Sequence, residues 1–271
     1  MLKYFKAKNY NFPLNKTYIM GILNITPDSF YDGGKYNNIT AAVSYAKQMI
    51  KDGADIIDIG AQSTRPGHTI VSSSEELERI LPILKALEDE VNIPISVDTF
   101  YYEVAYECLN AGAAIINDVS GLKNERMLEL IKETNCGYIL MHTFNDKDSD
   151  DIVIEVKDFF KDKLKKIKSY GIPCENICLD PGLGFKINSS DNMLLLKNTN
   201  KLNKFNTAYL IGTSNKRFTG EYSGVTDVNE RITGTIASNT IAILNGADII
   251  RVHDIRQAKR TVLFCDNYKN F

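Results

Sequence analysis

The sequence predicts an α/β protein of the closed (β/α)8 barrel class, and three observations favour that fold. The chain has 271 residues, which is within the usual length of one such barrel. Eight short apolar segments alternate with segments of helical periodicity. The pattern Gly-Ala-x-Ile-Ile-x occurs at residues 53–58, 112–117 and 246–251, each time after a helical segment. A unit that recurs in this way is typical of a repeated βα fold.

Each copy of this pattern indicates a turn followed by a strand. The glycine suits the left-handed backbone position just past the end of a helix. The two isoleucines then begin a short buried strand, and a polar residue follows them: Asp58, Asn117 or Arg251. Three strands of the barrel are therefore expected at these positions.

The remaining elements follow the same alternation. Further strands are expected at residues 18–23, 95–98, 138–142, 177–180 and 209–212. Helices are expected at residues 41–51, 77–87, 103–111, 151–170, 191–201 and 232–245. Ser72 or Ser73, with Glu75 or Glu76, indicates a capping box before the second helix. Residues 3–16 are expected to form a short hairpin or plug at the bottom of the barrel.

No linker divides the chain, so residues 1–271 are expected to form a single domain. The alternative topology is an open, doubly wound sheet. Against it, no Gly-x-Gly-x-x-Gly turn follows the first expected strand of the sheet.

Composition excludes several classes of protein. Hydrophobic residues make up 44% and charged residues 24%, which is ordinary for a globular protein and excludes general disorder. The net charge of −2 argues against a general binder of nucleic acid or of anionic membranes. No apolar run approaches the ~20 residues of a membrane span, and the N-terminus lacks the apolar region of a signal peptide, so a cytoplasmic protein is expected. Five cysteines without a CxxC pair indicate free thiols.

Polar residues gather where the expected strands end. They are Asn24, Asp58, Asp98, Asn117, Asp118, Met141 with His142, Asp180, Ser214 to Lys216, Arg251 and His253. The carboxyl ends of barrel strands meet at one mouth, where barrel enzymes keep their active sites. Any one of these residues could simply bond to a neighbouring loop, but convergence of the whole set favours a binding site.

The set also has a consistent chemistry. Arg65, Arg251, Lys216 and His253 can surround an anion, and the planar fork of arginine suits phosphate. The side chains of Asp98, Asn117 and Asp180 can hydrogen-bond a flat heterocycle. The residues alone therefore suggest a phosphorylated ligand that carries such a ring. Three histidines are too few for a histidine metal cage, so any Mg²⁺ is expected to rest partly on substrate phosphate oxygens.

Two turn-rich loops, at residues 24–34 and 60–67, are candidates for mobile lids at the mouth. Ordinary βα connections are the alternative for both. His142 is interpreted as a hydrogen-bonding residue beneath the pocket rather than as a catalyst, because the neighbouring Met141 would point into the site.

Eight motifs in order resemble those of the dihydropteroate synthases. The first is Met20-Gly-Ile-Leu-Asn-Ile-Thr-Pro-Asp-Ser-Phe30, and the second runs from Asp58 to Ser63-Thr-Arg-Pro-Gly67. The others are Ile95-Ser-Val-Asp-Thr99, Ile116-Asn-Asp-Val119, Met141-His142, Leu179-Asp-Pro-Gly-Leu-Gly-Phe185, Ser214 with Lys216, and Arg251-Val-His253. The resemblance spans residues 18–268 and implies a TIM barrel.

This resemblance implies a reaction and a set of site residues. The family joins 6-hydroxymethyl-7,8-dihydropterin diphosphate to 4-aminobenzoate and releases pyrophosphate. By resemblance, the pterin is bound by Asp98, Asn117, Asp180 and Lys216, with Met141 beside it. The diphosphate is surrounded by Asn24, Thr64, Arg65, Arg251 and His253, and Asn24 helps to hold Mg²⁺. The aminobenzoate subsite is shaped by Phe30, Asp32, Pro66, Phe185 and Ser214.

The resemblance further implies catalysis by Asp98, Asp180, Lys216, Arg251 and Arg65. It also implies a homodimer whose partners are these small substrates, with no nucleic acid and no membrane. Departure of pyrophosphate leaves a cationic methylene, so the expected reaction is SN1-like.

Some positions depart from the family pattern. Gln62 stands where the family often has Glu, Lys186 where it has a small residue before its lysine, and Asn215 where it has Arg; residues 143–150 also lack the usual loop sequence. Two alternatives remain open: a pterin-binding methyltransferase module, and a paralogue that binds pterin without catalysis.

Overall fold

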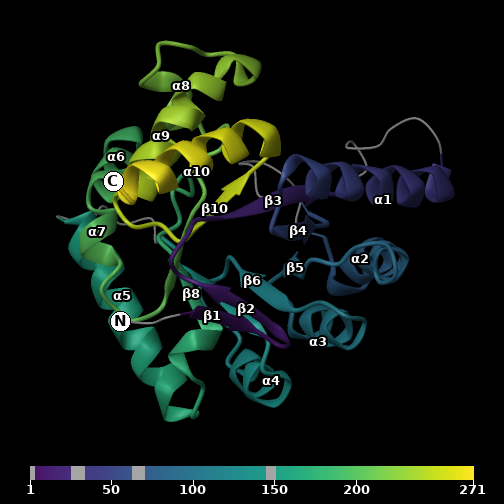
Figure 1. The fold of residues 1–271 in the computed structure, drawn as a ribbon. Helices are drawn as coiled ribbons and strands as arrows, with labels where there is room; N and C mark the ends of the chain where they lie inside the picture. Colours follow the sequence, from purple (N-terminus) through teal and green to yellow (C-terminus); the bar gives the residue numbers. More distant parts are fainter. Residues whose placement is uncertain (1–3, 26–33, 63–70, 145–150) are drawn as a thin grey trace.

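The strands of the main sheet close into a barrel. The computed structural model describes residues 4–25, 34–62, 71–144 and 151–271. The eight strands are β3 (Tyr18–Asn24), β4 (Ile56–Gly60), β5 (Ile95–Asp98), β6 (Ile115–Asp118), β7 (Gly137–Met141), β8 (Ile177–Asp180), β9 (Ala208–Ile211) and β10 (Ile249–Val252). They are parallel and pair in chain order, and β10 closes the sheet against β3 (Figure 1). The predicted (β/α)8 barrel is confirmed, and the open doubly wound sheet is excluded.

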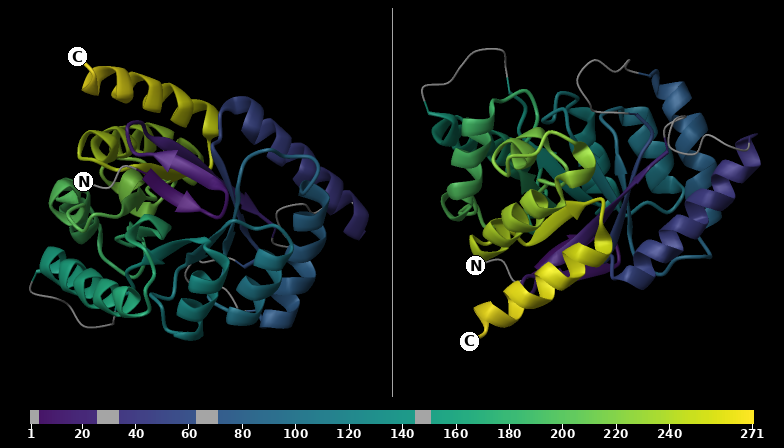
Figure 2. Two further views of the ribbon diagram at one scale, coloured as in Figure 1. Left: turned by 60° about the horizontal axis from the view of Figure 1, so that its bottom comes forward. Right: turned by 90° about the horizontal axis from the view of Figure 1, so that it is seen from above.

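Helices surround the barrel (Figure 2). They are α1 (Gly34–Asp52), α2 (Ser73–Leu87), α3 (Tyr102–Asn110), α4 (Arg126–Thr134), α5 (Ile152–Ser169), α6 (Ser189–Lys197), α7 (Thr199–Leu202), α8 (Arg217–Glu221), α9 (Ile232–Leu244) and α10 (Ile255–Lys269), with 3-10 turns η2 (Cys174–Asn176) and η3 (Val228–Glu230). Ser72 caps α2 by accepting a hydrogen bond from the Glu75 N–H at 3.3 Å, as one of the two capping alternatives predicts.

The sequence patterns gave some helices incorrectly. The single helix expected at 191–201 is two helices, because Asn198 leaves the helical backbone conformation between α6 and α7. Helices α4 and α10 were not expected at all. In α10 the useful signal was Asp254, whose carboxylate accepts the Gln257 N–H at 3.0 Å as an N-cap.

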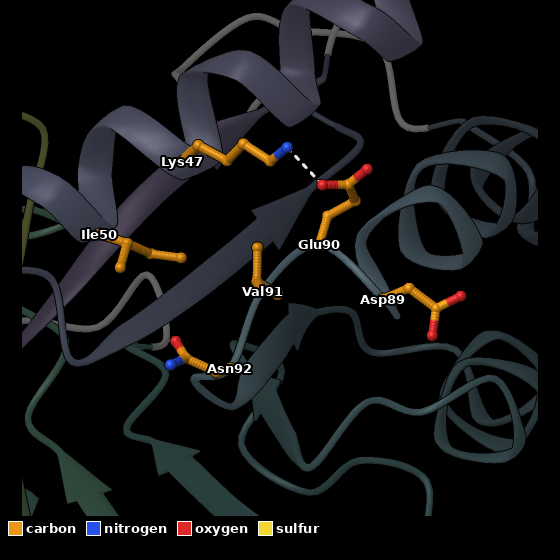
Figure 3. A pocket seen from close by; sticks show the side chains of 6 residues that line it. All are labelled: Lys47, Ile50, Asp89, Glu90, Val91 and Asn92. Carbon is orange, nitrogen blue, oxygen red and sulfur yellow. Dashed lines mark ion pairs between the residues drawn. The ribbon is translucent and has the colours of Figure 1, made fainter.

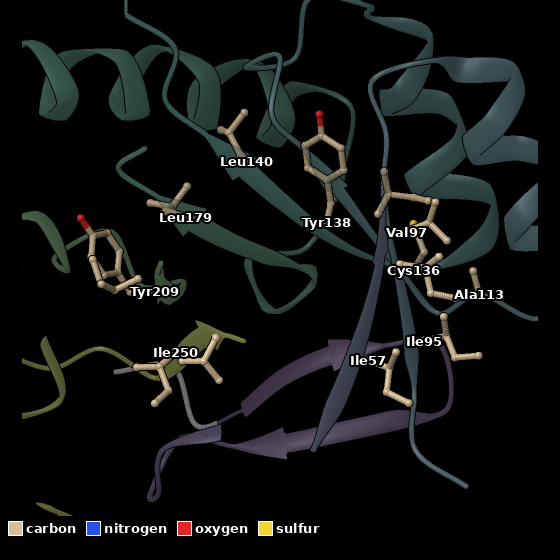
Figure 4. Packing of buried hydrophobic residues seen from close by; sticks show 14 of the residues in the cluster. Ile57, Ile95, Val97, Ala113, Cys136, Tyr138, Leu140, Leu179, Tyr209 and Ile250 are labelled. Atoms are coloured by element: carbon tan, nitrogen blue, oxygen red, sulfur yellow. The ribbon is translucent and has the colours of Figure 1, made fainter. Parts of the chain in front are cut away.

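Successive strand residues face opposite sides of the barrel wall. One buried cluster lies between the strands and the helices, and Figure 4 shows part of it, including Val97, Tyr138 and Leu179. A second cluster fills the barrel interior and includes Ile56, Ile115, Cys178 and Ile249, as well as residues of the N-terminal hairpin. This division decides which side chains can reach the mouth of the barrel.

A hairpin closes the amino-terminal end of the barrel. Strands β1 (Tyr4–Ala7) and β2 (Tyr10–Pro13) pair antiparallel and lie across this end (Figure 2). Phe5 and Phe12 belong to the interior cluster, and a Cβ atom placed on Gly137 would lie 2.7 Å from the Phe5 ring. The predicted plug is confirmed. None of the helices in the described part of the chain has both the length and the hydropathy of a membrane span.

We predict that the N-terminal hairpin stabilises the barrel largely through Phe5, whose side chain is 0% exposed. Phe5→Ala should lower the free energy of unfolding by about 3–5 kcal/mol, because it leaves a cavity in the barrel interior. Urea denaturation followed by circular dichroism measures this loss. Tyr10→Ala in the same hairpin is the control, since Tyr10 is 37% exposed and should cost about 1 kcal/mol or less. Equal losses for the two variants would contradict the packing role.

Candidate active site

Polar side chains replace apolar ones at the last inward position of several strands. Ile56, Ile115 and Ile249 lie in the interior cluster. The residues two positions later on the same strands are Asp58, Asn117 and Arg251, so they face the same interior nearer the mouth. Asp98 and Asp180 occupy the equivalent place on β5 and β8, and the apolar Met141 occupies it on β7. The period of two along each strand therefore gathers these side chains in one layer.

Arg251 is the centre of this layer. Its Nε donates to Asp58 Oδ2 at 2.6 Å, and its Nη2 donates to Asp98 Oδ2 at 2.8 Å. Asn117 Nδ2 donates to the same Asp58 oxygen at 3.2 Å. Charge-assisted hydrogen bonds of this length are strong in a buried setting. Residues 58, 98, 117 and 251, far apart in sequence, thus form one hydrogen-bonded cluster.

Asp180 and Lys216 lie beside this cluster. Asp180 accepts the Gly182 N–H at 2.8 Å, which orients its carboxylate. The Lys216 ammonium lies 4.0 Å from the centre of the Phe185 ring. A Cβ atom on Gly184 would lie 2.4 Å from Lys216 Cδ, so glycine leaves room there for the lysine stem. The loop after β8 therefore fixes Lys216 between an aromatic ring and the carboxylates.

Burial moves the pKa values of this cluster toward neutrality. Desolvation raises the pKa of Asp98 to about 7, although Arg251 opposes the change. Desolvation raises the pKa of Asp180 to about 6, against the Gly182 N–H and the nearby cations. Desolvation and then Arg251 lower the pKa of Lys216 to about 8. Burial opposes the charge on Arg251, but Asp58 and Asp98 outweigh it and raise the pKa. Perturbed groups of this kind cluster at functional sites.

Other predicted residues lie around the same mouth. Ser214 Oγ and His253 Nδ1 are 3.0 Å apart, and the His253 N–H donates to Ser214 Oγ at 3.2 Å, joining the ends of β9 and β10. A Cβ atom on Gly60 would lie 3.6 Å from Asn24 Oδ1 and 3.9 Å from Asp98 Oδ2. The Asn24 and Asp98 side chains therefore lie on either side of Gly60 at the mouth.

Five predicted residues lie outside the described part of the chain. They are Phe30, Asp32, Thr64, Arg65 and Pro66. The two candidate lid loops at residues 24–34 and 60–67 fall largely in the same gaps. Their roles remain predictions.

Neighbouring residues at two strand ends face opposite ways. Asp118, next to Asn117, points outward, where it accepts the Tyr138 hydroxyl at 2.5 Å and the Ser120 N–H at 2.7 Å. His142, next to Met141, is also buried on the outer side, with its ring centre 4.3 Å from that of Phe144. Desolvation lowers the pKa of His142 to about 4, so the ring is neutral. Its Nε2 lies 3.5 Å from Glu155 Oε1, and its Nδ1 is buried without a hydrogen-bond partner among the described residues. His142 is therefore a packed side chain on the outer side of the barrel wall rather than a fully hydrogen-bonded residue beneath the pocket.

Two buried carboxylates make contacts that the sequence patterns did not predict. Asp58, which the sequence placed only among the polar strand ends at the mouth, is 0% exposed and pairs with Arg251. Glu76, also 0% exposed, accepts a hydrogen bond from Gln62 Nε2 at 2.6 Å. Desolvation raises the pKa of Glu76 to about 7. The departure at Gln62 therefore supplies a donor to a buried acid.

The other two departures occupy left-handed turns. Asn215 has φ 57° and Lys186 has φ 51°. Asparagine tolerates this conformation better than most residues. The backbone of Asn215 is held on both sides, because its N–H donates to Thr235 Oγ1 at 3.1 Å and its carbonyl accepts from Arg231 at 2.9 Å. The loop before Lys216 is thus fixed by its main chain, and nothing in the structure explains Lys186.

Two hollows in the described surface lie away from the mouth. One, of about 390 Å³, lies between α1 and the segment before β5; the Lys47–Glu90 ion pair crosses it (Figure 3). The other, of about 480 Å³, lies on the outer face of α6 and α9 and includes Met193 and Ile241. Neither contains a residue of the polar layer, so neither is taken as the candidate active site.

Comparison with known proteins agrees with this fold and site. The pterin-binding enzyme family matches residues 20–253, and the chain therefore belongs to the pterin-binding enzymes. Its relatives within that family include dihydropteroate synthases. The protein of Clostridium beijerinckii is 40% identical over 262 residues, covering 96% of this chain and 97% of that one. The protein of Synechocystis is 44% identical over 248 residues, covering 89% and 86%.

Solved dihydropteroate synthases have the same fold. The Xanthomonas albilineans enzyme with 4-aminobenzoic acid is 34% identical, with a TM-score of 0.95 over 100% of both chains. The Clostridium difficile enzyme in the presence of pteroic acid is 41% identical, with a TM-score of 0.90 over 99% of both chains. The predicted family is confirmed.

We predict that Gln62→Glu destabilises the protein at pH 8. It removes the donor to Glu76 and places a second carboxylate against it, at a cost of about 1–3 kcal/mol. Because the pKa of buried Glu76 is raised to about 7, the loss should shrink as the pH falls toward 5 and protonation restores a donor. Urea denaturation at both pH values measures it. Gln48→Glu is the control, since Gln48 bonds Asp52 at 3.0 Å in solvent; equal losses at both positions would argue against the buried pair.

Proposed function

We propose that the polar layer at the barrel mouth carries out the dihydropteroate synthase reaction. In that reaction 6-hydroxymethyl-7,8-dihydropterin diphosphate condenses with 4-aminobenzoate to give 7,8-dihydropteroate and pyrophosphate. The supporting observation is the buried Arg251, shared between Asp58 and Asp98 beside Asp180 and Lys216. Acceptors for a flat ring and cations for its diphosphate are thus held within one mouth.

The pterin is proposed to lie against the polar layer. A carboxylate can accept two parallel hydrogen bonds from an aminopyrimidinone edge, a role we assign to Asp98 and Asp180. Asn117 offers an amide to the same ring, and Lys216 a cation beside it. Met141 is 2% exposed and pairs in register with Asp180, which places its thioether near the ring.

The diphosphate and the aminobenzoate are proposed to lie farther out. Asn24, Thr64, Arg65, Arg251 and His253 surround the diphosphate. Phe30, Asp32, Pro66, Phe185 and Ser214 form the aminobenzoate subsite. The nearness of Ser214 to His253 joins the two subsites across β9 and β10.

The chemistry follows from charge placement. The bond between the pterin methylene and its oxygen breaks, and pyrophosphate leaves with the electron pair. Asp98 and Asp180 favour the cationic methylene that remains, while Arg251, Arg65 and Lys216 favour the leaving anion. The aromatic amine then attacks the methylene and loses a proton. No side-chain nucleophile is needed, and exclusion of water protects the cation.

Mg²⁺ is proposed as the cofactor, held by Asn24 and by substrate oxygens. The described residues contain no group of three or more His, Cys, Asp and Glu side chains that could hold a metal ion. One amide oxygen from Asn24 together with substrate oxygens fits Mg²⁺, a hard cation that keeps several waters and is bound mainly by phosphates. When bound, the ion neutralises charge on the departing pyrophosphate.

We also propose a single cytoplasmic domain that acts as a homodimer on these small substrates, without nucleic acid or membrane. Light scattering of the purified protein tests the oligomeric state.

The aminobenzoate-dependent release of pyrophosphate tests the reaction itself. A methyltransferase module would release none, and an inactive paralogue would bind the pterin without release. The dihydropteroate synthases among the relatives favour neither alternative.

We predict that Arg251→Ala lowers turnover by a factor of about 100 or more, the scale expected when a donor to developing charge is removed. The same is expected for Arg65→Ala. Steady-state pyrophosphate release measures the loss, and circular dichroism confirms the fold. Arg126→Ala is the control, because Arg126 forms an exposed pair with Glu103 at 3.2 Å away from the mouth. Near-normal turnover of a folded Arg251→Ala variant would reject the diphosphate role.

We predict that pterin binding weakens as the pH falls. Because burial raises the pKa of Asp98 to about 7 and that of Asp180 to about 6, both lose the charged, accepting form below those values. Calorimetry with the pterin diphosphate between pH 5 and 9 should show this acid limb. Asp98→Asn should weaken binding at pH 8. The loss of affinity at low pH that remains in this variant should follow the protonation of Asp180. An unchanged dissociation constant in this variant would exclude Asp98 from the pterin edge.

A further inference from the structure

Asp58 lies directly beneath the proposed pterin site without opening to it. Its side chain is 0% exposed, whereas the side chains of Asp98 and Arg251 are 10% and 15% exposed. Asp58 comes from β4, and its two hydrogen-bond donors come from β10 and β6. It therefore joins three strands of the barrel from within the polar layer, at a position that is closed to solvent.

One oxygen of Asp58 orients two residues of the layer. Oδ2 accepts from Arg251 Nε at 2.6 Å and from Asn117 Nδ2 at 3.2 Å. A carboxylate can only accept, so the amide nitrogen of Asn117 must face it. The amide oxygen is then turned elsewhere, and it is buried without a hydrogen-bond partner among the described residues. Buried polar atoms are rarely left unpaired unless they have a functional role.

Asp58 also competes with Asp98 for Arg251. The guanidinium is planar, so a bond at Nε and a bond at Nη2 fix its plane and its direction. The bond to Asp58 is the shorter, at 2.6 Å against 2.8 Å. Arg251 is thereby anchored from below, and its charge is divided between two carboxylates.

We propose that Asp58 is a positioning residue for the reaction: it holds Arg251 and Asn117 in the orientation that receives the pterin diphosphate, and it keeps Asp98 from being fully paired. This inference rests on the proposed function. It gives Asp58 no contact with substrate, so its effect is transmitted through the two residues it binds.

The proposal has an electrostatic consequence at Asp98. Asp98 faces Arg251 from β10, Asp58 from β4, Glu76 from α2, Asp118 from β6, and Lys216 after β9. Only the two cations stabilise its charged form. Removing the charge of Asp58 takes away one repulsive neighbour and leaves more of Arg251 to Asp98. Both changes lower the pKa of Asp98, so the acid limb of pterin binding moves to lower pH.

Asp58→Asn tests the proposal with the intact protein and the pterin diphosphate. At pH 8 the dissociation constant should rise by about 10- to 100-fold, the scale of lost positioning groups at other sites. The midpoint of the acid limb should also move to lower pH. Weaker binding alone could come from a structural defect. A shifted midpoint, in contrast, shows that the charge of Asp58 affects the pKa of Asp98. An unchanged dissociation constant or an unmoved midpoint would overturn the proposal.

Asp248→Asn is the matched control. Asp248 is a partly buried carboxylate just before β10, at the opposite end of that strand from the mouth, and it accepts the Tyr209 N–H at 2.9 Å. The control should cost stability while leaving both the pterin affinity and the midpoint unchanged. If it shifts the midpoint as Asp58→Asn does, the effect is general and the proposal fails.

If the Asp58→Asn variant does not fold, a measurement on the unmodified protein can still test the proposal. The Nε–H of Arg251, assigned by its loss in Arg251→Lys, should exchange slowly with solvent in nitrogen-15 spectra. Exchange as fast as that of exposed Arg126 would overturn the anchoring by Asp58. If the unmodified protein binds no pterin diphosphate at all, the proposed function fails instead, and slow exchange at Arg251 can still be observed.

Discussion

The mouth of the barrel depends on one buried interaction, the division of the Arg251 guanidinium between Asp58 and Asp98. Removing one partner from a buried ion pair costs several kcal/mol, since the remaining charge is left uncompensated in a poorly polarisable environment. A closed barrel makes the pairing possible, because strands β4, β5 and β10 aim their inward residues at one axis. The same closure limits access of water, so the charges act on one another strongly.

The rest of the fold holds this layer in place from two sides. Below it, the interior is filled by apolar residues and by Phe5 and Phe12 of the hairpin, so the charged layer rests on a packed floor. Outside it, the Asp118–Tyr138 hydrogen bond joins β6 to β7, and the ring contact of His142 with Phe159 packs the end of β7 against α5. Polar residues next to one another in sequence thus serve different purposes, because alternate residues of a strand face opposite sides.

The sequence predicted the barrel, the plug and most of the strand ends, because apolar periodicity and Gly-Ala-x-Ile-Ile repeats are local signals. It did not separate Asn117 from Asp118, which face opposite sides of the wall, since that depends on the phase of each strand. The sequence also could not predict the role of Asp58, because its hydrogen bond with Arg251, a residue far away in the chain, leaves no local pattern. Glu76 was taken only as part of a cap, whereas its partner Gln62 comes from the preceding loop.

The charge balance of the layer bears on what else the site requires. Three carboxylates, Asp58, Asp98 and Asp180, face two cations, Arg251 and Lys216, in the part of the mouth that the structure describes. An excess of acceptors suits a ring rich in N–H donors and a methylene that becomes cationic. It leaves the charge of a diphosphate only partly offset, because Arg251 is also paired with Asp58 and Asp98. We infer that the anion also depends on other groups, such as His253 and the proposed Mg²⁺. The carboxylates near the barrel axis would then stabilise the cationic methylene, and the other cationic groups would stabilise the departing pyrophosphate.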